Sequence, residues 1–72
     1  MAKFRVEMTD EFGFVLSRQT FDTKKEMEDH IEGLKGYADE IFKHTSRKML
    51  RLVRYHMPEN DWVEDDVESI FM

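Results

Sequence analysis

The middle of the chain carries an apolar stripe at helical spacing. Thr23 is followed three residues later by Glu26, the capping-box pattern with which many helices begin. Steps of four and three residues then place five apolar side chains on one face of a helix: Met27, Ile31, Leu34, Ala38 and Ile41. Gly33 and Gly36 each weaken a helix by roughly 1 kcal/mol relative to alanine, so a break between them is the alternative. Because the stripe keeps its phase through both glycines, one amphipathic helix that ends near Lys43 is the favoured prediction.

Three segments with strand character surround this helix. FRVEM, residues 4–8, alternates apolar and polar side chains as a half-buried strand does. The turn DEFG follows, in which Gly13 can take a positive φ, and FVLSRQTF at 14–21 then predicts the second strand of a hairpin. Its uneven faces indicate either a bulge or a strand that is covered on both sides near its start. RKMLRLVRYHM at 47–57 alternates again and ends at Pro58, which cannot donate a backbone hydrogen bond to a ladder.

These elements predict an α+β fold of two layers. We expect a three-stranded antiparallel sheet, formed by a β-hairpin and a later strand, with one amphipathic helix packed across it. The predicted ββαβ domain covers residues 1–58, and residues 59–72 form an acidic amphipathic C-terminal segment docked on the same domain.

Size and composition fit one small domain. A chain of 72 residues has room for a single core, and its 40% hydrophobic content is too high for a disordered chain. It contains no cysteine, which excludes disulfides and cysteine zinc sites and favours a cytoplasmic setting. The charged Lys3 and the lack of a long apolar run argue against both a signal peptide and a transmembrane segment.

The C-terminal segment WVEDDVESIFM is predicted to form a short helix. Asp61 can cap it, with Glu64 three residues further on. Four apolar residues collect on one side of such a helix, with Trp62 at its shoulder: Val63, Val67, Ile70 and Phe71. A helix of about ten residues is not stable alone in water, so this one must pack on something. The domain's own sheet is the favoured site, and another protein is the alternative.

Charge is strongly segregated along the chain. The net charge is -5, but residues 43–56 carry five basic side chains and no acid, and residues 57–72 carry six acidic side chains and no base. If the chain turns back at Pro58, the acidic segment can lie over the basic strand and neutralise it. Exposed ion pairs contribute only about 0 to 1 kcal/mol each, so apolar contacts would have to assist such docking.

Catalytic and metal-binding patterns are missing from the sequence. His30, His44 and His56 lie far apart and show no ligand spacing for zinc. The glycines form no phosphate-binding loop, and the acidic segment lacks the central glycine of a calcium loop. We therefore expect no enzyme activity, no cofactor and no metal site.

The first function hypothesis is a small cytoplasmic protein that binds another protein as an adaptor, inhibitor or regulator. Six methionines and several bulky apolar groups suit adaptable protein contacts. Compact inhibitors encoded by phages resemble it in size and class, and its acidic segments could imitate nucleic-acid phosphates. The sequence is also compatible with a homodimer. The predicted partner-binding residues all lie in the C-terminal segment: Trp62, Val63, Glu64, Asp65, Asp66, Val67, Ile70 and Phe71.

The alternative is a nucleic-acid-binding regulator that uses the basic strand. Cations meet phosphates and an aromatic ring stacks on a base in such surfaces. The residues predicted for this role are Arg47, Lys48, Arg51, Arg54 and Tyr55. Strand alternation weakens this hypothesis, because it directs Arg51 and Arg54 to opposite faces of the sheet.

Overall fold

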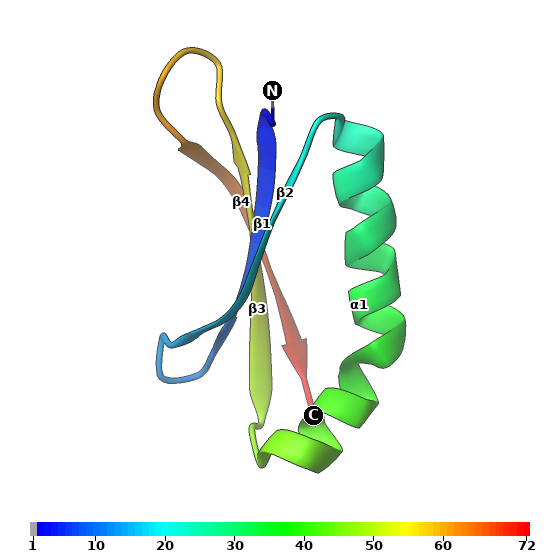
Figure 1. The fold of residues 1–72 in the computed structure, drawn as a ribbon. Helices are drawn as coiled ribbons and strands as arrows, with labels where there is room; N and C mark the ends of the chain where they lie inside the picture. Colours follow the sequence, from blue (N-terminus) through cyan, green and yellow to red (C-terminus); the bar gives the residue numbers. More distant parts are fainter. Residues whose placement is uncertain (1) are drawn as a thin grey trace.

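The computed structural model describes residues 2–72, which form an α+β fold of two layers (Figure 1). Along the chain the elements are β1 (Phe4–Asp10), β2 (Val15–Phe21), α1 (Lys24–Thr45), β3 (Met49–His56) and β4 (Val63–Phe71). The strands form one antiparallel sheet in the order β2-β1-β3-β4. Helix α1 lies along one face of this sheet, and in residues 2–72 no helix covers the other face.

The C-terminal segment is a strand, so the prediction of a three-stranded sheet with a short C-terminal helix is wrong. β4 pairs with β3, which satisfies backbone groups that a short helix would leave to water. Its β-branched valines and isoleucine fit an extended backbone, and Arg54 of β3 forms an ion pair with Glu68 of β4 at 3.2 Å. The register skips Asp65, and this bulge disguises the alternation of the strand in the sequence.

Helix α1 runs without a break through both internal glycines, as predicted. The Thr23 hydroxyl oxygen accepts a hydrogen bond from the Glu26 amide at 3.2 Å and donates one to the Glu26 carboxylate at 3.0 Å. The helix ends at Ser46, which takes the left-handed conformation with φ of 58°. Within residues 2–72 no helix is both long and apolar enough to cross a membrane.

The core lies between α1 and the sheet face beneath it. Alternate residues of β1 and β3 meet the apolar stripe of the helix, and Leu52 at 0% exposure is the most deeply buried of them. The buried cluster consists of Val6, Met8, Met27, Ile31, Ala38, Phe42, Leu50 and Leu52. Leu34, Ile41 and Ile70 pack at its margin.

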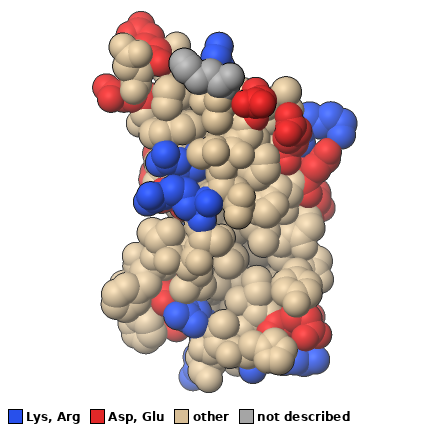
Figure 2. All heavy atoms as spheres, viewed as in Figure 1, with Lys and Arg blue, Asp and Glu red and all other residues tan. Residues whose placement is uncertain are grey.

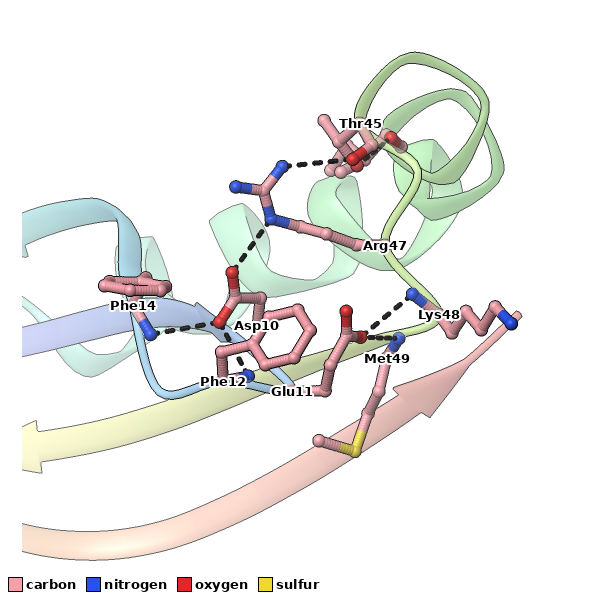
Figure 3. Close-up of polar contacts among 9 residues, drawn as sticks. Asp10, Glu11, Phe12, Phe14, Thr45, Arg47, Lys48 and Met49 are labelled. Carbon is pink, nitrogen blue, oxygen red and sulfur yellow. Dashed lines mark hydrogen bonds and ion pairs between the residues drawn. The ribbon is translucent and has the colours of Figure 1, made fainter.

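The turn between β1 and β2 is organised by Asp10 (Figure 3). Its Oδ1 accepts hydrogen bonds from the amides of Phe12 at 2.9 Å and Phe14 at 3.0 Å, and Gly13 takes a φ of 88°. Its Oδ2 accepts a hydrogen bond from Arg47 Nε at 3.0 Å, although the Asp10 side chain is only 2% exposed. Burial acts to raise the pKa of Asp10, but the hydrogen bonds from Arg47, Phe14 and Phe12 outweigh it and lower the pKa below 3.8.

The same turn also holds the start of β3. Glu11 Oε2 accepts hydrogen bonds from the amides of Lys48 and Met49, both at 2.9 Å (Figure 3). In β2 the register skips Leu16, which confirms the predicted bulge. Two adjacent carboxylates therefore tie the first hairpin to the connection between α1 and β3.

Candidate interaction surface

The candidate site is the side of the sheet that faces away from α1, called here the open face. Register and alternation place on it the side chains that lie between the core positions of each strand. It comprises Arg5, Glu7, Thr9, Val15, Arg18, Thr20, Met49, Arg51, Val53, Tyr55, Glu64, Val67, Ser69 and Phe71. In Figure 2, which has the view of Figure 1, the open face lies on the left and is seen edge-on. Basic side chains lie near its middle, above a largely uncharged area.

One half of the open face is a closed polar cluster around Glu7. The Glu7 carboxylate lies 2.6 Å from Arg18 Nε and 3.8 Å from Arg5 Nη1, and accepts a hydrogen bond from the Tyr55 hydroxyl at 3.3 Å. The Trp62 ring stacks on the Arg5 guanidinium at 4.2 Å. Burial and the negative charge of Glu7 raise the pKa of Tyr55 above 10.0. Glu7 is 8% exposed, so these contacts cover it without a helix.

The other half of the open face is uncovered, and it carries exposed apolar side chains on either side of Ser69 and Arg51. Val67 and Phe71 of β4 are 43% and 70% exposed. Phe12 and Phe14 are also exposed, at the β1–β2 turn, which bends away from α1 (Figure 1). Clustered exposed apolar side chains are typical of interaction sites, whereas single ones are common on any surface.

The structure divides the residues predicted to bind a partner. Val67, Phe71 and Glu64 lie on the open face, whereas Ile70 packs against the core. Trp62 belongs to the Glu7 cluster through its contact with Arg5. Val63 and Asp66 pair with His56 and Arg54 on the opposite face of the sheet, and Asp65 lies in the bulge. Two of the four apolar residues of the predicted stripe therefore share the uncovered surface.

The residues predicted to bind nucleic acid are also separated. Arg47 is paired with Asp10 at the far end of α1, and Lys48 follows it in the same connection. Arg51 and Tyr55 lie on the open face, and Arg54 lies on the opposite face. The basic strand therefore does not present these charges as one surface.

Arg54 is engaged in a network between α1 and β4. Its guanidinium donates to both Glu28 oxygens at 2.9 and 3.3 Å and to Glu68 at 3.2 Å, and Lys35 Nζ lies 2.5 Å from Glu68. The hydrogen bond from Arg54 lowers the pKa of Glu28, and that from Lys35 lowers the pKa of Glu68. Only 13% of the Arg54 side chain is exposed, so its charge stabilises the contact between α1 and β4.

Sequence reasoning missed the Glu7 cluster and the turn aromatics. Alternation placed Arg5 and Glu7 on the polar side of their strand, but only the pairing of β1 with β2 brings Arg18 to them. Phe12 and Phe14 flank the turn glycine in DEFGF, and that spacing was the available signal.

In residues 2–72 no group of three or more histidine or acidic side chains is placed to hold a metal ion. A groove of about 720 Å³ lies between the start of α1 and β4 and is lined by side chains of both charges. Comparison with known proteins finds no matching family model, no matching curated protein and no matching solved structure.

Proposed function

We propose that this protein is a non-enzymatic, cytoplasmic binding module that docks a partner protein on the uncovered half of its open face. The observation that carries the proposal is the contrast between a sheet face buried under α1 and an opposite face on which Phe71 and Val67 are exposed. A partner that covered these side chains would remove apolar surface from water at about 25 cal/mol per Å². The proposal covers adaptors, inhibitors and regulators alike, because all three act through the bound partner.

Nucleic-acid binding has weaker support. Arg47 and Arg54 are occupied by carboxylates, and Arg5 and Arg18 both contact Glu7. Arg51 is the remaining basic residue of the open face. A single cation beside an apolar surface favours a protein partner, because nucleic-acid affinity grows with the number of phosphates that are neutralised.

Affinity capture with matched variants tests the proposal. Val67→Ser combined with Phe71→Ser should release bound partners, because it removes the apolar surface while the side chains contribute little to the core. Tyr37→Ser is the matched control, since Tyr37 is 59% exposed but lies on α1, away from the open face. Loss of partners with Tyr37→Ser, or their retention by the double variant, would contradict the proposal.

A further inference from the structure

The free edge of the sheet at β4 presents backbone groups that no other strand uses. The Met72 amide donates to the Lys48 carbonyl at 3.0 Å, which fixes the direction of the backbone at this end of the strand pair. In an antiparallel pair, residues alternate between bonding the neighbouring strand and facing away from it. Val67, Ser69 and Phe71 therefore direct their N–H and C=O groups away from β3, and among these groups the Val67 amide already donates to Asp66 Oδ1 at 3.0 Å. β4 is last in the strand order, so within residues 2–72 no segment pairs with this side.

The two sides of this edge differ in chemistry. Val67 and Phe71 lie beside it on the open face, where they are uncharged and exposed. On the other side lie Asp66 and Glu68, next to the groove between α1 and β4. A strand added to β4 would place successive side chains alternately against an apolar and an acidic surface.

The acidic side chains of β4 indicate which kind of strand can pair with its free edge. Four acidic side chains lie in β4, and Glu64 and Asp66 make no ion pair with another residue of the described chain. A second copy paired through β4 would place like charges close together, which destabilises a strand pair. Basic side chains would instead meet opposite charge.

We propose that β4 binds an extended segment of the partner in which apolar and basic residues alternate, by adding it to the sheet as a fifth strand. This inference rests on the proposed function and names the class of segment that the surface takes. Backbone hydrogen bonds to the carbonyl of Val67 and to the amides and carbonyls of Ser69 and Phe71 hold the segment. Its apolar residues extend the open face, and its lysine or arginine residues lie beside Asp66, since Glu68 is already paired with Lys35 and Arg54.

The test uses a capped nine-residue peptide that alternates lysine and valine, and a peptide of the same composition with the lysines grouped together. We expect the alternating peptide to bind at least tenfold more tightly, with slowed amide exchange at Ser69 and Phe71. Ser69→Pro removes only an outward amide and should weaken binding at least tenfold, whereas Ser69→Ala keeps that amide and should change it less than twofold.

Methylation of the peptide backbone provides a test that does not depend on the folding of a variant. Only one alternate set of peptide amides can face β4, so methylation of one set should abolish binding and methylation of the other should not. Equal effects of the two sets, equal binding of the grouped peptide, or unchanged binding to a folded Ser69→Pro variant would overturn the inference. So would a dimer in sedimentation that Ser69→Pro dissociates, because the occupant would then be a second copy.

The peptide experiment and the affinity-capture experiment can fail independently, so they test the two proposals separately. If the alternating peptide does not bind while Val67→Ser with Phe71→Ser still releases captured partners, the edge inference is wrong and the open-face proposal stands. If the double variant retains its partners, the open-face proposal is wrong, whatever the peptide does.

Discussion

The two faces of the sheet are built from neighbouring residues of the same strands, yet they hold different chemistry. Under α1, Val6 and Leu52 are 2% and 0% exposed and belong to a continuous apolar core. Their neighbours on the open face, Glu7 and Val53, are 8% and 7% exposed without a helix above them in the described chain. Phe71 on that face remains 70% exposed. One face stabilises the fold, and the other combines a closed polar cluster with apolar surface that is free for a partner.

Truncation of a core residue should have the largest effect. Leu52→Ala leaves a cavity under α1 and should lower the free energy of unfolding by about 2–5 kcal/mol. Urea denaturation measures this change. A loss below about 1 kcal/mol would show that the helix does not pack on this face.

The next largest effect on stability should come from Arg54, and it should exceed the effect of Arg51 on the other face of β3. Arg54→Ala leaves Glu28 and Glu68 without their shared cation and should cost about 1–2 kcal/mol, a range reduced because both partners are partly exposed to water. Arg51→Ala on the open face is the matched control and should change stability by less than about 0.5 kcal/mol. Equal effects of the two substitutions in urea denaturation would contradict the assignment of faces.

Acid should lower the free energy of unfolding through the same network of Arg54, Glu28 and Glu68. The pKa values of Glu28 and Glu68 lie below 4.5 in the fold, so near pH 4.5 the unfolded chain binds more protons than the folded one. Their contribution is present above about pH 4.5 and is lost as pH falls through the folded pKa values. Urea midpoints between pH 7 and pH 3 should fall less steeply for Glu28→Gln with Glu68→Gln than for the unmodified chain. An unchanged slope would exclude the network as the cause.

The exposed apolar residues of β4 should have only a small effect on stability. Val67→Ser with Phe71→Ser should change the free energy of unfolding by less than about 1 kcal/mol, because both side chains already contact water. A loss as large as that of Leu52→Ala in the same urea experiment would mean that the open face belongs to the core of the fold.

The sequence predicts the helix, the first hairpin and β3 because each has a strong local signal. Thr23 and Glu26 mark the start of the helix, and alternation marks β1 and β3. β4 escapes prediction because the bulge at Asp65 breaks its alternation, and the remaining apolar spacing also fits a helix. Long-range pairing with β3 decides between the two, and a local pattern does not contain it.

The site is predicted in part for the same reason. Val67 and Phe71 belong to the predicted apolar stripe and do lie on the uncovered surface, whereas Ile70 of that stripe packs against the core. A strand separates neighbours that a helix would group together. The Glu7 cluster depends on the register between strands, so the pattern of one segment does not predict it.

Amide hydrogen exchange along β4, followed by NMR, tests the central claim most directly. The amides of Glu68 and Ile70 face β3 and should exchange slowly, whereas those of Ser69 and Phe71 face the free edge and should exchange fast in the unbound protein. Protection at all four positions, or at none, would contradict an edge strand with a free outer side.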